Sequence, residues 1–169
     1  VLLVLNFVCL WLVANSDDAA YHYDIALQAI HTQANFKEGA AQLELALESV
    51  AEDGSISAEY RQLLGTCYYK IGRSVDACAQ FKIAINLFGW ENAPSVIGNY
   101  LEALNSANRL SEALEASEIG LKWHPANIHV VYNSGVVRQK LRMHADAIDL
   151  FLRVNEMDAA FLEAWERAI

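Results

Sequence analysis

The chain has 169 residues, of which 54% are hydrophobic, and this apolar content excludes a disordered protein and allows a sizeable core. Its formal net charge is −9, and its twelve basic residues are scattered, which argues against nucleic-acid binding and favours a protein or peptide partner with a neutral or basic segment. With two prolines and long stretches rich in Ala, Leu, Glu and Gln, the composition predicts an all-helical protein.

Residues 1–16 form an apolar leader, and the first fourteen of them carry no charge. This segment is too short to span a membrane, which takes about 20 residues. It fits the apolar core of a signal peptide, with small residues at Ala14 and Ser16, and it also fits the end of a membrane helix or a buried helix. Anchoring in a membrane or export is therefore expected in preference to a cytoplasmic location. Because the chain begins with Val1, we expect it to be a piece of a longer protein.

A repeat runs along the rest of the chain, marked by a small residue that follows an acidic one. The four pairs are Glu38-Gly39, Asp76-Ala77, Glu112-Ala113 and Asp146-Ala147, at intervals of 38, 36 and 34 residues. Apolar or small residues recur four and seven positions later, a spacing that places them on one helix face. Twelve positions earlier come Leu27, Gly65, Leu101 and Gly135, each in an earlier apolar stretch. The spacing predicts two helices in each repeat.

Turn signals separate the predicted helices. Within repeats they are Ile71-Gly72-Arg73, Ala107-Asn108-Arg109 and Leu141-Arg142-Met143, and between repeats they lie near residues 53–54, 89–94 and 124–127. Pro125 cannot continue a helix and so enforces a break. The predicted repeats are residues 20–53, 58–91, 94–127 and 128–161, with the start of a further repeat at 162–169.

The second repeat, with Leu64-Gly65, Tyr68, Gly72, Asp76-Ala77 and Phe81, resembles the tetratricopeptide repeat (TPR) family. The fourth repeat is similar, through Gly135, Ala147 and Phe151. The third departs from the pattern, with Leu101 for the small residue and Ser117 for the aromatic one. The resemblance implies an all-α fold, a right-handed superhelix of stacked helical hairpins with a concave inner surface. Small residues let paired helices approach, and the aromatic residue fills the space beside them.

The resemblance also assigns the inner surface to one face of the first helix in each hairpin. The expected partner-binding residues are Gln28, Gln62, Thr66, Tyr69, Lys70, Asn99, Glu102, Asn105, Tyr132, Asn133 and Gln139. Amide side chains donate and accept together, which suits them to clamp the backbone of an extended peptide. A solvated helix face without a ligand is the alternative interpretation.

These residues predict a non-catalytic scaffold that binds a peptide or partner protein, with self-association expected through open repeat ends. The alternative is the recognition arm of a larger enzyme, such as a glycosyltransferase, whose catalytic domain lies outside the fragment. No catalytic, phosphate-binding or metal-binding motif is recognisable, so no cofactor and no metal is expected. Cys67 and Cys78 fit either two buried thiols or a disulfide.

Overall fold

The computed structural model describes residues 18–32, 34–52 and 54–159, and all the regular structure in these ranges is helical. The all-α fold predicted from the sequence is confirmed. The apolar leader at 1–16 and the start of a further repeat at 162–169 lie outside the described residues. The chain divides into two compact units, Val1–Leu87 and Phe88–Ile169.

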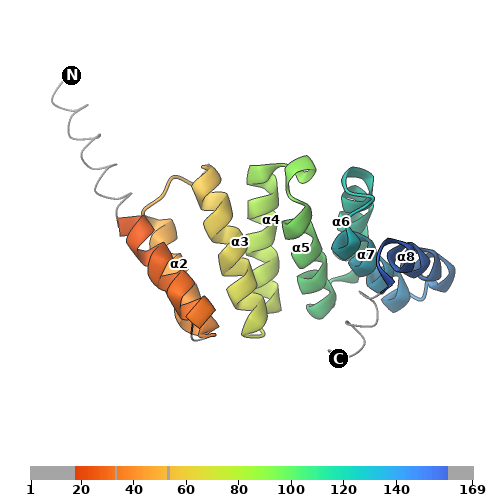
Figure 1. Cartoon of the computed structure of the whole chain (residues 1–169), viewed down its shortest axis with the longest axis horizontal. Helices are drawn as coiled ribbons and strands as arrows, with labels where there is room; N and C mark the ends of the chain where they lie inside the picture. Colours follow the sequence, from red (N-terminus) through yellow and green to blue (C-terminus); the bar gives the residue numbers. More distant parts are fainter. Residues whose placement is uncertain (1–17, 33, 53, 160–169) are drawn as a thin grey trace, which may run out of the picture. The chain divides into compact units, whose positions relative to one another are not determined.

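The first unit contains a helix over residues 18–32, α2 (Phe36–Glu48), α3 (Ser55–Lys70) and α4 (Ser74–Phe88). In Figure 1 the 18–32 helix and α3 lie nearer the viewer, and α2 lies behind them and packs against α3. The Asn35 side chain caps α2 by accepting a hydrogen bond from the Glu38 amide at 3.2 Å. Glu38 adds a negative charge to the first turn, where the helix dipole favours it.

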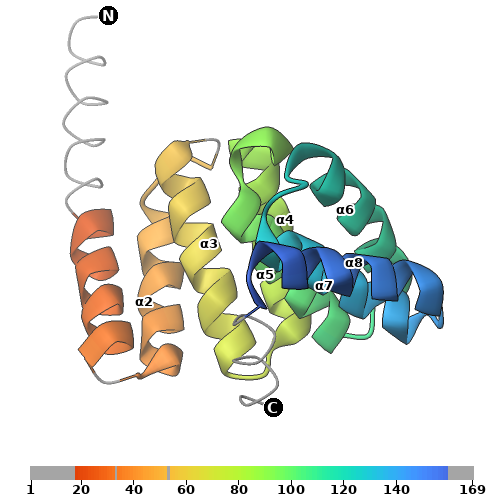
Figure 2. The ribbon, with the colours of Figure 1, turned by 45° about the vertical axis from the view of Figure 1, so that its right-hand side comes forward.

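The second unit contains the short 3₁₀ helix η1 (Trp90–Asn92), followed by α5 (Pro94–Ser106), α6 (Leu110–Trp123), α7 (Ile128–Lys140) and α8 (His144–Met157). The central helix is α7, which packs against α5, α6 and α8 (Figure 2). Pro94 stands in the first turn of α5, where its missing N–H costs nothing. The Asn127 side chain caps α7 by accepting from the Val130 amide at 3.1 Å.

Close helix crossings occur where the sequence places small residues, as predicted. A β-carbon added at Gly65 would lie 2.8 Å from the Phe81 ring, and one added at Gly135 would lie 2.7 Å from the Phe151 ring. Both distances are too short for carbon atoms in contact. In the second and fourth repeats the aromatic side chain therefore occupies the volume that a larger residue would need at the crossing.

In the third repeat the large and the small residue of the helix crossing have exchanged positions. Leu101 and Ser117 stand at the positions of Gly65 and Phe81, and both have 0% exposure. We infer that the leucine fills the space that the aromatic ring takes in the second repeat. The Ser117 hydroxyl donates to the Leu114 carbonyl and accepts from the Arg138 guanidinium at 3.0 Å, so its buried oxygen is satisfied.

The turns inside the last three hairpins share one backbone geometry, and the first hairpin differs. Gly72, Asn108 and Arg142 have positive φ angles of 81°, 57° and 62°. Ala34 in the first hairpin also has a positive φ, of 49°, but the Asn35 amide that follows it reaches back six residues to the Ala29 carbonyl. In the other three turns the next amide reaches back five residues: Arg73 to Tyr68, Arg109 to Leu104 and Met143 to Arg138, at 2.8–3.0 Å. This is the left-handed helix end known as the Schellman motif. The three turns predicted within repeats are confirmed as helix ends.

Candidate functional site

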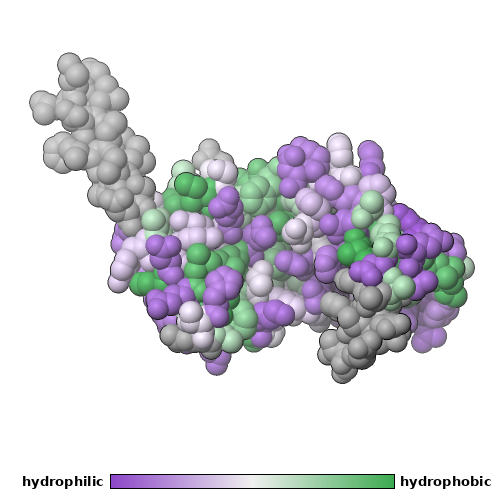
Figure 3. All heavy atoms as spheres, viewed as in Figure 1, coloured by the Kyte–Doolittle hydropathy of each residue, from purple (hydrophilic) through white to green (hydrophobic). Residues whose placement is uncertain are grey.

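The first unit carries an open groove between the 18–32 helix and α3, with a volume of about 250 Å³. It is lined by Tyr23, Leu27, Glu59, Gln62, Leu63 and Thr66. Gln62 and Thr66 were predicted as partner-binding residues, and the structure brings these two together in the groove. Figure 3 shows polar and apolar side chains interspersed over the face that these helices present. The groove combines an apolar lining with side chains that can donate and accept hydrogen bonds.

One of the groove residues, Tyr23, is stacked on the buried Tyr60. The Tyr23 ring, on the 18–32 helix, lies 4.5 Å from the Tyr60 ring on α3, with 13° between the ring planes. Burial raises the pKa of both phenols, and the carboxylates of Glu59 and Asp24 raise it further. Of these two carboxylates, Glu59 belongs to the groove lining together with Tyr23.

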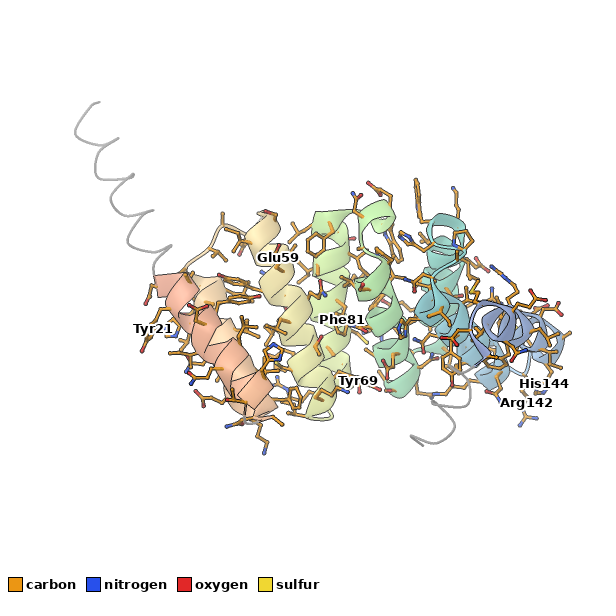
Figure 4. The ribbon with its side chains drawn as sticks, viewed as in Figure 1. Tyr21, Glu59, Tyr69, Phe81, Arg142 and His144 are labelled. Atoms are coloured by element: carbon orange, nitrogen blue, oxygen red, sulfur yellow. The ribbon has the colours of Figure 1, made fainter. Side chains whose placement is uncertain are left out.

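The other predicted residues of the first unit lie away from the groove lining. Gln28 is exposed, and its backbone carbonyl accepts from the Thr32 hydroxyl. Tyr69 lies toward the end of α3 (Figure 4) and is half-buried, and the exposed Lys70 ammonium lies 5.9 Å from its ring. Tyr69 and Lys70 continue the face of Gln62 and Thr66 toward the end of α3, because they lie seven and four residues after them.

In the second unit, two of the predicted residues hold α5 and α7 together. Asn105 and Asn133 are each only 5% exposed. The Asn133 amide donates to the Gly98 carbonyl at 3.2 Å, and the Asn105 amide lies 3.5 Å from the Asn133 carbonyl. The Lys140 ammonium donates to the Asn105 carbonyl at 2.7 Å. These amide donors are therefore engaged in the contact between the two helices.

The remaining predicted residues of the second unit are more accessible. Asn99 and Glu102 are half-buried on α5, and Gln139 is exposed on α7. The half-buried Tyr132 ring lies 5.7 Å from the Phe151 ring and packs against the core formed with Val131. Tyr132 thus has a packing role in the α7 and α8 pair.

Sequence reasoning missed four residues of the groove: Tyr23, Leu27, Glu59 and Leu63. Leu27 was assigned to the helix crossing because it aligns with Gly65. A signal was present on α3, because Glu59, Gln62, Leu63 and Thr66 follow the i, i+3, i+4, i+7 spacing of one helix face. No comparable signal distinguishes Tyr23 from the other aromatic residues.

The described residues contain no group of His, Cys, Asp and Glu side chains that could hold a metal ion. Two histidines make hydrogen bonds within the fold: the His22 ring with the Gln42 side chain and the His124 ring with the Trp90 carbonyl, each at 2.7 Å. Cys67 and Cys78 are buried thiols, and burial raises the pKa of Cys67 to about 11. This pKa disfavours the reactive thiolate form of Cys67.

No helix in the described ranges combines the length and the apolar character that crossing a membrane requires. The leader, on which the expectation of anchoring or export depends, is outside those ranges.

No family model matches the sequence, and no curated protein matches it. Solved structures do match. The crystal structure of YrrB, described as a TPR protein with an unusual peptide-binding site, has a TM-score of 0.75 at 20% identity. The match spans 90% of this chain and 75% of the YrrB chain. MamA from Desulfovibrio magneticus RS-1 has a TM-score of 0.73 at 16% identity, covering 85% of this chain and 77% of its own.

A further crystal structure of MamA gives a TM-score of 0.75 at 17% identity over 88% of this chain and 78% of its own. At such identities the likeness concerns the fold. It agrees with the paired small and aromatic residues and with the shared turn geometry of the hairpins. The chain therefore has the TPR-like fold, built from helical hairpins like those of these structures.

Proposed function

We propose that this chain is a non-catalytic interaction scaffold that holds an extended segment of a partner protein against the first helices of its hairpins. The observation that carries the proposal is the groove between the 18–32 helix and α3. Its volume of about 250 Å³ is below the roughly 300–1,000 Å³ of small-molecule sites, so it suits one side chain of a larger partner.

The chemistry of the groove fits an extended peptide. Leu27 and Leu63 offer apolar contact, and the Gln62 amide can donate to and accept from a peptide backbone. The Thr66 hydroxyl donates to the Gln62 carbonyl at 3.0 Å and retains capacity to accept. The described peptide-binding site of YrrB, on the same fold, adds support by analogy.

The proposed binding surface keeps all the residues predicted from the sequence, with their roles refined by position. Gln62 and Thr66 contact the partner inside the groove, and Gln28, Tyr69 and Lys70 contact it beyond. In the second unit Asn99, Glu102, Tyr132 and Gln139 offer side-chain contacts. Asn105 and Asn133 serve mainly to fix α5 against α7, which sets the shape of that surface.

The experiment is a selection of binders from a random decapeptide library with the full 169-residue chain. Amide chemical shifts of the isotope-labelled chain, followed by NMR during titration with a selected peptide, then map the contact. The proposal expects shifts concentrated on the first helices of the hairpins, which are the 18–32 helix, α3, α5 and α7. Shifts confined to the second helices of the hairpins would contradict it.

Self-association is a separate proposal. Ile148 and Leu152, one turn apart on α8, are 58% and 57% exposed, and such apolar pairs favour contact between copies. We expect the light-scattering mass to rise with concentration, and a constant monomer mass would contradict this.

A further inference from the structure

The groove of the first unit has an uncompensated negative charge at its rim. Glu59 lines it, and Asp24 directly follows the lining residue Tyr23 on the 18–32 helix. Within the described residues, neither carboxylate forms an ion pair with a Lys, Arg or His side chain. Figure 4 shows Glu59 on α3, toward the beginning of that helix. The exposed Glu59 carboxylate thus belongs to a groove whose lining contains no cation, and the exposed Asp24 adjoins that lining in sequence.

The basic side chains on the neighbouring turns are engaged elsewhere. The Arg61 guanidinium donates to the Ser57 hydroxyl and to the Gln80 side chain, at 3.3 and 3.0 Å. Lys70 lies at the other end of α3, beside Tyr69. No described base is therefore positioned to neutralise the groove from within the fold.

The apolar part of the groove matches the stem of a long basic side chain. Leu27 and Leu63 are half-buried and belong to the two facing helices. Lys and Arg bury their methylene stems along apolar surfaces while the charged head stays near water or a carboxylate. A groove with leucines in its lining and a carboxylate at its rim suits such a side chain along its whole length.

Tyr23 supplies a third contact of the same kind. Stacking on Tyr60 covers one face of its ring and restricts the ring's motion, and Tyr23 also lines the groove. A cation near an aromatic ring is attracted by the ring's electrons, and a guanidinium stacks on aromatic rings especially well. An acidic side chain in the same place would meet the carboxylates of Glu59 and Asp24 and be repelled.

We propose that this groove is a pocket for the arginine or lysine side chain of the bound peptide, with its stem between Leu27 and Leu63 and its charge beside Glu59, Asp24 and Tyr23. The inference rests on the proposed scaffold function and adds the class of residue that the scaffold selects. Gln62 and Thr66 then contact the peptide backbone on either side of that residue. The net charge of −9 also favours the approach of a basic segment.

The test uses decapeptides selected from the random library with the full chain. We expect one position to be enriched in arginine or lysine. Replacing that arginine by citrulline, which has nearly the same shape but no charge, should weaken binding about tenfold, as expected for one exposed ion pair and one cation–π contact. For a lysine, acetylation of its amine gives the corresponding neutral peptide.

The matched variants are Asp24→Asn with Glu59→Gln, and Glu48→Gln with Glu52→Gln as a control that removes two exposed acids outside the groove lining. The first pair should bind the charged and neutral peptides equally, and the control pair should keep the preference. Unfolding curves verify that both variants fold.

The outcomes separate the two proposals. Bound peptides without an enriched basic position, or equal affinity for arginine and citrulline, would overturn the inference and leave the scaffold function standing. A preference for arginine that survives in the Asp24→Asn, Glu59→Gln variant would also overturn it. If the library yields no bound peptide, the scaffold function and this inference are both contradicted.

Discussion

The Asn133 side chain on α7 donates a hydrogen bond to the Gly98 carbonyl on α5, at 3.2 Å and with Asn133 only 5% exposed. Replacing Asn133 with alanine removes this bond and leaves a small void between the helices. We expect Asn133→Ala to lower the free energy of unfolding by about 1–2 kcal/mol. Asn99→Ala, at a half-buried position on α5, should change it by less than about 0.5 kcal/mol. Urea denaturation measures the unfolding free energy of both variants. Equal losses would contradict the conclusion that Asn133 holds α5 and α7 together.

The close crossing at Gly65 predicts a penalty for even one added methyl group. Gly65→Ala gains about 0.5–1 kcal/mol of helix propensity but overpacks against Phe81, which costs about 1–3 kcal/mol. We expect a net destabilisation of about 1 kcal/mol. Adding Phe81→Leu makes room for the methyl group, so the double variant should lose less stability than the sum of the two single ones. Additive losses would show that the two positions do not compete for space.

The positive φ angles at the turns predict that Arg142→Gly raises the stability of the protein and that Gly72→Ala, at the equivalent position, lowers it. Arg142, at the turn between α7 and α8 (Figure 4), has a φ of 62°, which costs about 1–2 kcal/mol for a residue with a side chain. Arg142→Gly should therefore stabilise the protein by about 0.5–1 kcal/mol, after the extra chain entropy of glycine is subtracted.

Gly72 is the matched control, because its φ is 81° and a β-carbon there would meet no atom within 4 Å. Gly72→Ala should destabilise by about 1 kcal/mol through the backbone alone. Thermal unfolding of the two variants measures both signs, and a stabilising Gly72→Ala would contradict the turn geometry.

Burial of Cys67 predicts a loss of stability at high pH. Its pKa rises from 9.0 to about 11 in the folded protein, so the unfolded chain releases this proton first. The contribution is fully present below pH 9 and is lost as the pH rises toward 11, by at most about 1.4 kcal/mol per pH unit. Cys67→Ala removes it. The difference in unfolding free energy between wild type and variant should shrink above pH 9, whereas a constant difference would contradict the burial.

The same thiol bears on the redox interpretation of the cysteines. With Cys67 and Cys78 as buried thiols, the chain should unfold at the same temperature with and without a reductant. A lower unfolding temperature in reductant would indicate a disulfide.

Much of the fold could be predicted because each hairpin repeats the same physical requirement. Gly65 with Phe81 and Gly135 with Phe151 mark two crossings, and Gly72 marks a turn by its freedom to adopt a positive φ. Arg142 adopts the same turn without a glycine, so its alignment with Gly72 was the only signal. Leu101 and Ser117 each depart from the repeat pattern, because the pattern treats the two positions separately. Packing depends on the summed volume of the two side chains, which a large and a small residue can supply in either order.

The candidate site was less predictable for a geometric reason. Helical spacing assigns residues to a face that is about 100° wide. A neighbouring helix covers only part of that face, so the spacing does not say which of its residues are buried. Asn99 and Asn105 both fall within it, but only Asn105 is buried against α7. Apolar residues such as Leu63 are assigned to the core by default, although a groove between helices needs them as well.

The central claim is that the face of the 18–32 helix and α3 binds a peptide, and the most direct measurement is affinity after a change to that face alone. Gln62→Ala with Thr66→Ala preserves helix propensity, and Asn86→Ala with Glu115→Ala is a matched control on exposed positions of α4 and α6. Calorimetric titration with a selected decapeptide should show at least about tenfold weaker binding for the first pair, because two polar contacts of about 1 kcal/mol each are lost. The control pair should bind the peptide with the same affinity as the unchanged chain. Unchanged affinity in a stably folded Gln62→Ala, Thr66→Ala variant would contradict the account.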